Sequence, residues 1–315
     1  MDKLKTKLRE KAIELLESKK VDMVIGWGES FNPTKTTPVF VRGSQEAAKL
    51  VFNPFCLNNL AVYLPRLSER AAIFTKPCEA GSIVALLAEG KINRNNLYIV
   101  GVACRGVIDP AKLKLASGDI NEATQAYLDG ADVVVRIGGQ EKRVAFSEVV
   151  LNKCLACDHQ DRVFCDEMIG DPVQPPTGEI KSPVGEDADA LWWRKFWMKE
   201  FSRCTRCYAC REACPACYCR DSCSAQSHRE KWTGTKQGPK EALMFHALRA
   251  VHVAGRCLEC GACEKACPVG IPLTLLHSQV GKAVEELFDF KAGESTDKRP
   301  PLETFKREGL GKNAI

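Results

Sequence analysis

The residues with the clearest chemical potential in this 315-residue chain are its 17 cysteines, most of which lie between Cys204 and Cys267. Within that stretch the pattern C-x-x-C-x-x-C-x-x-x-C-P occurs twice, and the second copy begins 53 residues after the first. Three thiolates on one tight loop reach three corners of an iron–sulfur cubane, and the proline after the fourth cysteine turns the chain away toward the other cluster. The spacing therefore predicts two [4Fe-4S] clusters, one held by Cys204, Cys207, Cys210 and Cys267 and the other by Cys257, Cys260, Cys263 and Cys214.

Zinc is the main alternative for these eight cysteines, but zinc sites take four ligands in two pairs, which this run does not resemble. Every ordinary cubane corner has a cysteine, so chemistry at an open iron is not expected and electron transfer is. Three more cysteines, Cys217, Cys219 and Cys223, follow the first copy. They could ligate an extra cluster or a zinc ion, or they could pack around the first cluster as thiols.

Four cysteines of the N-terminal half form a further candidate site. Cys78 and Cys104 each follow a predicted strand, at the edge where the crevice of an open α/β sheet lies. Cys154 and Cys157 form a C-x-x-C loop that can chelate. Together these four thiolates are enough for a third [4Fe-4S] cluster. The alternative is that Cys78 and Cys104 are small buried hydrophobic residues, which is common for cysteine.

The elements that must position these residues fall into two groups. The N-terminal part alternates helical and strand-like patterns, with helices predicted over 3–19 and 82–89 and strands over 21–25, 71–75, 97–103, 132–137 and 143–146. Such alternation predicts an α/β domain with a mostly parallel sheet. The C-terminal part has no strand-like alternation. Helices are predicted there over 191–201 and over 240–253, the second after the start signal Gly238-Pro239.

Proline-rich sequence separates the two parts. Residues 171–190 contain four prolines and cannot form a regular element, so they are predicted to be a linker. The expected organisation is an α/β domain over 1–170, this linker, a mainly helical 2x[4Fe-4S] ferredoxin domain over 191–288, and an extended arm over 289–315. The arm, which is charged and contains Pro300-Pro301, buries little surface alone.

Composition excludes several classes of protein. Hydrophobic residues make up 45% and charged residues 27%, an ordinary globular balance, and the net charge of +5 does not favour a dedicated nucleic-acid binder. No apolar run approaches the roughly 18 residues of a membrane span. Residues 1–10 are charged and lack the apolar core of a signal peptide, so a cytoplasmic protein is expected. In that compartment cysteines are metal ligands or redox thiols more often than disulfides.

Both parts resemble known families. The run Gly255 to Leu273 makes residues 195–285 similar to helical dicluster ferredoxin domains of heterodisulfide-reductase, succinate-dehydrogenase-like and Rnf-type subunits. The Pro77-Cys78 turn, Cys104 after a later strand, and Cys154-x-x-Cys157 followed by Gly170-Asp171 resemble the beta subunit family of deazaflavin-coenzyme-reducing hydrogenases and formate dehydrogenases over residues 20–172.

The resemblance implies an iron–sulfur electron-transfer subunit without a substrate site of its own. Its implied partners are flavoprotein, hydrogenase, formate-dehydrogenase or heterodisulfide-reductase-like subunits, including flavin-based bifurcating assemblies. The alternative is a flavin-containing subunit that itself reduces or oxidises a deazaflavin or nicotinamide. Flavin-binding members of the family begin with a Gly-Gly turn, whereas residues 8–19 here are charged and free of glycine, so FAD is not favoured.

Overall fold

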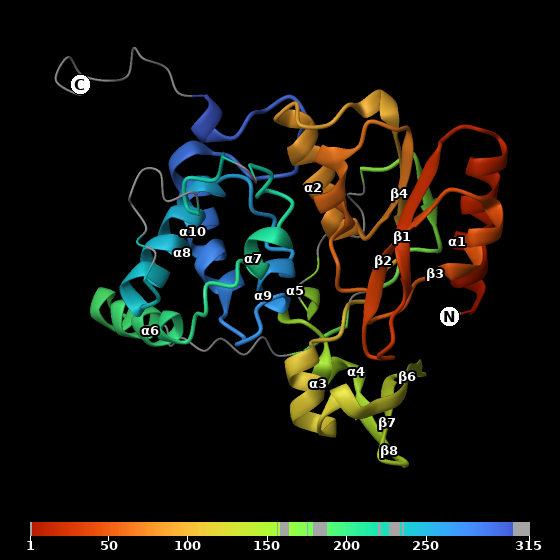
Figure 1. Cartoon of the computed structure of the whole chain (residues 1–315), viewed down its shortest axis with the longest axis horizontal. Coiled ribbons are helices and arrows are strands. Elements are labelled where there is room, and N and C mark those ends of the chain that lie inside the picture. Colours follow the sequence, from red (N-terminus) through yellow and green to blue (C-terminus); the bar gives the residue numbers. More distant parts are fainter. Residues whose placement is uncertain are drawn as a thin grey trace.

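The computed structural model describes residues 2–155, 157, 164–174, 176–178, 188–219, 222–226, 234 and 236–304. Residue 175 and residues 179–187 of the predicted linker fall outside these residues, as do residues 305–315 of the predicted arm. Figure 1 shows an α/β domain, coloured red to yellow-green, beside a helical domain coloured green to blue.

The α/β domain is built on one mostly parallel sheet, as predicted. Its strand order is β2-β1-β4-β5-β9, with β3 also paired to β1; β1, β4, β5 and β9 are parallel, and β2 and β3 run antiparallel to β1. The strands are β1 Met23–Glu29, β2 Thr36–Val41, β3 Leu50–Val51, β4 Ala71–Thr75, β5 Leu97–Val102 and β9 Glu167–Ile169. Every residue of β4 is buried, because helices α1 (Asp2–Glu17) and α2 (Pro77–Ala88) lie on opposite sides of the sheet (Figure 1).

The predicted strands 132–137 and 143–146 lie outside this sheet, as β7 Asp132–Ile137 and β8 Gln140–Ala145. Together with β6 Ala123–Asp129, which the sequence pattern did not predict, they form a separate antiparallel sheet in the order β6-β7-β8. Each connection has only two residues, and Gly130, Gly138 and Gly139 supply the positive φ angles that such hairpin turns need. Connections this short cannot join parallel strands, which need a long crossover. The sheet packs near α3 (Pro110–Ser117) and α4 (Phe146–Val149).

Helix α2 begins five residues earlier than the sequence pattern predicted. Pro77 occupies its first turn, where its missing N–H costs nothing, and Cys78 therefore lies at the start of the helix. A short helix, α5 (Asn152–Leu155), carries Cys154. Helices α2 and α5 thus lie on the side of the α/β domain that is next to the helical domain (Figure 1).

The helical domain has three longer helices and two short ones. They are α6 Ala190–Ser202, α7 Ala209–Glu212, α8 Pro239–His252, α9 Ala262–Lys265 and α10 Leu273–Phe288. The predicted helices are found as α6 and α8, which pack on each other. Their shared core includes Trp197, Phe201 and Phe245, and the Phe201 ring stacks on His246 at a centroid distance of 4.5 Å. This core supports the loops that carry the cysteines.

Candidate functional site

The two cysteine repeats have the same backbone conformation. Arg206 and Glu259 have φ of 51° and 53°, and Tyr208 and Gly261, which precede α7 and α9, have φ of 61° and 73°. Residues other than glycine rarely adopt positive φ, so these turns are a specific feature of both loops. In each copy a backbone N–H donates to the first sulfur at 3.4 Å, from Arg206 to Cys204 and from Glu259 to Cys257. Such bonds stabilise negative charge on sulfur.

The first set of cysteines (Cys204, Cys207, Cys210 and Cys267) lines a single pocket. Cys267 comes from the second copy of the motif, so this pocket brings three cysteines of one copy together with the fourth cysteine of the other. Burial, the largest influence, raises the pKa of the Cys210 thiol to about 11. Cys207 is exposed, so this pocket lies close to the protein surface.

The second set (Cys257, Cys260, Cys263 and Cys214) lines another pocket. Side chains from helix α2 of the other domain, including Ser82, Leu86 and Glu89, line the same pocket. Burial raises the pKa of the Cys263 thiol to about 12. The second set therefore lies at the seam between the domains, whereas the first set lies away from it.

The N-terminal set (Cys78, Cys104, Cys154 and Cys157) comes from three separate elements. Cys78 begins α2, Cys104 follows β5, and Cys154 lies on α5. Cys104 interacts electrostatically with Cys78 and Cys154, and Cys154 interacts with Cys157. Burial raises the pKa of Cys104 to about 12 and that of Cys78 to about 11. The fold thus gathers the predicted thiols at one end of the parallel sheet.

All three sets suit a group that binds thiolates. Burial raises the pKa values of the Cys78, Cys104, Cys210 and Cys263 thiols, whereas a hydrogen bond with Cys217 lowers the pKa of Cys214 to about 6. Thiols must lose their protons to bind metal, and a metal group that binds only the folded chain stabilises the fold. [4Fe-4S] clusters bound there would supply one-electron transfer, and the assignment of individual ligands remains a prediction.

A partly buried lysine connects the N-terminal set to the second set. The ammonium of Lys153 lies 3.7 Å from the Cys78 sulfur and donates a hydrogen bond of 2.6 Å to the Cys260 carbonyl. Burial alone would lower the pKa of Lys153, but the charges of Cys78, Cys260 and Glu79 outweigh it and raise the pKa.

A buried arginine has the equivalent place between the two sets of the helical domain. Arg249 on α8 is 3% exposed, and its guanidinium donates to the Cys210 carbonyl at 3.2 Å. It also lines the pocket of the second set beside Cys214 and Cys263, and its positive charge lowers the pKa values of both thiols. Its other contact is His277 Nε2, at 2.8 Å.

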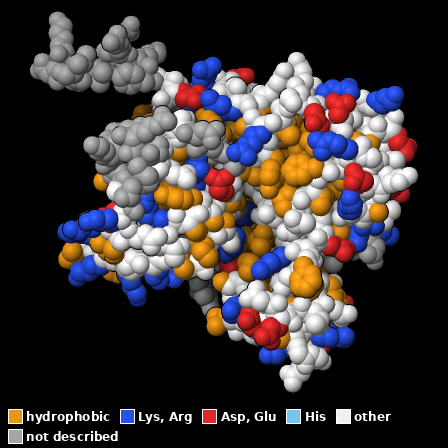
Figure 2. All heavy atoms as spheres, in the orientation of Figure 1, with side chains coloured by type: hydrophobic (Ala, Val, Ile, Leu, Met, Phe, Trp, Pro, Cys, Tyr) orange, Lys and Arg blue, Asp and Glu red, His pale blue; other side chains and the backbone are white. Residues whose placement is uncertain are grey.

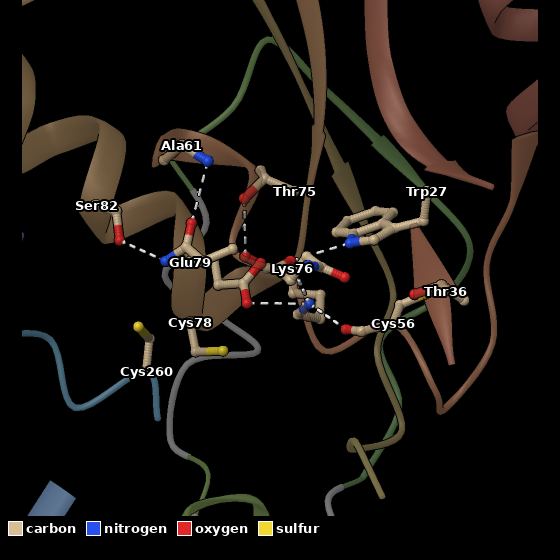
Figure 3. A network of polar contacts seen from close by, with 12 residues as sticks. Trp27, Thr36, Cys56, Ala61, Thr75, Lys76, Cys78, Glu79, Ser82 and Cys260 are labelled. Atoms are coloured by element: carbon tan, nitrogen blue, oxygen red, sulfur yellow. Dashed lines mark hydrogen bonds and ion pairs between the residues drawn. The ribbon is translucent and has the colours of Figure 1, made fainter. Parts of the chain in front are cut away.

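Behind Cys78 lies a buried ion pair. Lys76 and Glu79, 1% and 2% exposed, are 3.0 Å apart, and Lys76 also donates to the Cys56 carbonyl at 2.5 Å. Figure 3 shows this network between the Trp27 ring and Cys78, and also labels Cys260 of the helical domain. The second carboxylate oxygen of Glu79 has no hydrogen-bond partner. The pair carries no net charge: Glu79 raises and Lys76 lowers the pKa of the neighbouring Cys78 thiol.

The three additional cysteines line a pocket of their own. Cys217, Cys219 and Cys223 lie on its wall together with the side chains of Arg211, Arg249, His252 and Arg256. Among the described residues, no group of three or more His, Cys, Asp or Glu is arranged to hold a single metal ion. Whether these cysteines bind a group remains a prediction to be tested.

Sequence reasoning missed the cations that accompany the cysteines. Lys153 directly precedes a predicted ligand, but nothing in the local pattern shows that it reaches residue 260, more than a hundred positions away. Arg249 reads in sequence as one polar position on an amphipathic helix. Their roles depend on packing between distant segments, which local patterns do not report.

The outer surface of the helical domain is strongly basic. Figure 2 shows Lys and Arg side chains where Figure 1 places α6, and Arg194, Lys195, Lys199 and Arg203 are exposed there. Apolar side chains lie among them, including Leu191 at 53% exposed.

Within the described part of the chain, no helix is long and apolar enough to cross a membrane.

Known proteins are similar both to the segment with the two cysteine repeats and to nearly the whole chain. Residues 203–271 match the 4Fe-4S dicluster domain family. The chain is 24% identical to the F420-dependent formate dehydrogenase subunit beta of Methanocaldococcus jannaschii, over 93% of this chain and 92% of that protein. It is 23% identical to the F420-dependent formate dehydrogenase 1 subunit beta of Methanococcus maripaludis, over 91% and 90%. The expected resemblance to this beta-subunit family, joined to a dicluster domain, is confirmed.

One solved structure is a more distant match. It is titled xenon derivatization of the F420-reducing [NiFe] hydrogenase complex from Methanosarcina barkeri. It matches 50% of this chain and 64% of its own at 15% identity, with a TM-score of 0.39. A similarity this low supports no conclusion about function.

Proposed function

We propose, from its similarity along nearly the whole length to beta subunits of F420-dependent formate dehydrogenases, that this protein is an iron–sulfur electron-transfer subunit of a formate-dehydrogenase- or hydrogenase-type complex. The observation that carries the proposal is the crossed arrangement of eight cysteines around two pockets inside a 4Fe-4S dicluster domain. Each pocket combines three cysteines of one motif with the fourth of the other, the arrangement that two-cluster ferredoxins require.

The N-terminal set extends the proposal to three clusters. Its thiols gather beside the second set, and the lysine that touches both sets supplies positive charge where bound iron–sulfur groups would add negative charge. The protein would then receive electrons on one side and deliver them on the other, while partner subunits carry the substrate chemistry.

The deciding experiment is a count of iron per chain on anaerobically purified protein, with flavin absorbance read from the same sample. Three clusters correspond to about 12 irons and two to about 8. About 12 irons without flavin supports an electron conduit with the N-terminal set occupied. About 16 would assign a cluster to Cys217, Cys219 and Cys223 as well. Stoichiometric flavin would instead support a subunit that itself reduces or oxidises a deazaflavin or nicotinamide, and assays of those two reactions would follow.

A double substitution assigns the third cluster to its ligands. Cys154→Ser with Cys157→Ser removes two of its four proposed thiolates, so iron should fall by about four per chain while the other two clusters remain. Cys165→Ser, a cysteine outside all three sets, is the matched control and should leave iron unchanged. Full iron content in the double variant would contradict the N-terminal assignment.

A further inference from the structure

The three thiolate sets follow one another through the molecule, and one basic side chain lies at each of the two junctions. Lys153 lies between the N-terminal set and the second set, and Arg249 lies between the second set and the first. These two residues come from different domains and different elements, α5 and α8. The two residues are therefore placed equivalently, each between two successive sets.

At the domain junction, Lys153 contacts both neighbouring sets at once. Its nitrogen is 3.7 Å from the Cys78 sulfur on one side and 2.6 Å from the Cys260 carbonyl oxygen on the other. Glu79 is the carboxylate that influences the pKa of Lys153, but its ion-pair partner is Lys76, at 3.0 Å. The charge of Lys153 is therefore directed mainly at the thiolates.

At the second junction, Arg249 has the same relation to its neighbours. It donates to the backbone carbonyl of Cys210 from the first set and lines the pocket of the second set together with Cys214 and Cys263. Its remaining partner, His277, is a neutral acceptor, because burial and the Arg249 charge lower the pKa of His277 to about 3. No carboxylate among the described residues forms a salt bridge with Arg249 to offset its charge.

We propose that Lys153 and Arg249 are positioning residues of the electron path, each holding two successive thiolate sets together and stabilising the negative charge that one added electron brings to either side. Clusters held by successive sets would exchange one electron, and the cation between them would gain or lose neither electron nor proton. The inference deepens the proposed function and depends on it, because Lys153 can act this way only if the N-terminal set holds a cluster.

The physical basis is Coulombic. A positive charge within about 4 Å of a group in a partly buried site interacts with it by several kcal/mol at an effective dielectric constant near 20. Outer-shell charges and hydrogen bonds of this kind tune the potentials of iron–sulfur sites. A cation shared by two sets would raise the reduction potentials of the clusters bound at both. The difference between the two potentials would therefore change little.

A merely structural role predicts a different result. If Lys153 only fixes the domains to each other, a neutral hydrogen-bond donor at its position would preserve the potentials. If the positive charge of Lys153 sets the potentials, only a cationic side chain at this position would preserve them. The informative pair is therefore Lys153→Gln, which keeps a donor without the charge, and Lys153→Arg, which keeps the charge.

The experiment measures iron content and the midpoint potentials of the clusters, by redox titration followed by electron paramagnetic resonance, on the anaerobic full-length protein. In K153Q we expect full iron content and a shift to more negative potential in two of the three signals. In K153R we expect potentials close to those of the original protein. Lys112→Gln is the matched control, since Lys112 also holds the segment next to Lys153, through the Val150 carbonyl and the Asn152 side chain.

The outcomes separate the two proposals. Full iron with unshifted potentials in K153Q would overturn this inference and leave the proposed function intact. About 8 irons in the original protein would remove the N-terminal cluster and overturn both the three-cluster proposal and the role of Lys153. Should K153Q lose iron, Arg249→Gln against Arg249→Lys provides the same comparison at the other junction, where a negative shift in the two dicluster signals of R249Q alone is expected. Equal potentials in R249Q and R249K would count against the inference.

Discussion

At the scale of single residues, we expect substitution of one member of the buried ion pair Lys76–Glu79 to lower the stability of the fold strongly. Both side chains are almost fully buried, and Lys76 also contacts a backbone carbonyl and the Trp27 ring. Lys76→Met would leave the Glu79 carboxylate buried without its partner, and breaking a buried pair in this way typically costs about 3–5 kcal/mol. We expect a correspondingly lower urea midpoint for the variant, measured anaerobically on the iron-loaded protein.

The control for this prediction removes both charges. Lys76→Met combined with Glu79→Gln leaves no unpaired charge, so a large part of the lost stability should return. If the double variant were no more stable than the single one, the loss would come from packing against Trp27 rather than from the ion pair.

At the scale of elements, Asp109 performs two tasks with its two carboxylate oxygens. One accepts a hydrogen bond from the Ala111 backbone at 2.9 Å and caps α3, and the other binds the Lys265 ammonium of α9 at 2.7 Å. Asp109→Ala should lose both, about 1 kcal/mol for the cap and a similar amount or more for the charged hydrogen bond. Asp109→Asn keeps the cap and should lose less. Thermal melting of the two variants measures the difference, and equal losses would show that the cap contributes little.

The elements also show what sequence could predict. Strand β4 and helices α6 and α8 were predicted within one or two residues, because each has a clear period and clear end signals. The crossing of the two cysteine motifs followed from their spacing. The separate sheet of β6 to β8 did not follow from the sequence, because periodicity identifies strands but not the strands with which they pair. Gly130 and Gly138-Gly139 nevertheless mark its hairpin turns. The cations at the two junctions were missed because they act across the fold.

At the scale of the whole molecule, the two domains meet at close quarters beside the second set. A side chain at Gly81 on α2 would meet Leu258 of the cysteine loop at 3.3 Å, and Gly293 lies against both. Gly81→Val should improve the local helix by a few tenths of a kcal/mol yet force the domains apart, an overpacking cost of about 1–3 kcal/mol. We expect faster limited proteolysis than in the original protein. Gly43→Val, at a position with open space around it, should not change the rate.

The segment that closes this seam is the C-terminal strap, residues 289–304. Gly293 packs on Gly81 and Leu258, Pro301 packs on Gly255, and Glu303 pairs with Arg256 at 3.0 Å. Figure 1 shows the strap, in blue, running from the end of α10 toward α2. It therefore joins both domains over the loop that carries the second set.

The strap follows every cysteine in the chain, and this order has a consequence for biosynthesis. As the polypeptide leaves the ribosome, all the proposed ligands emerge before the segment that fastens the two domains together. A cluster inserted at this stage would reach Cys78 and Cys260 before the strap docks. We expect the docked strap, through the contacts of Gly293 and Glu303, to slow the loss of iron from the second set.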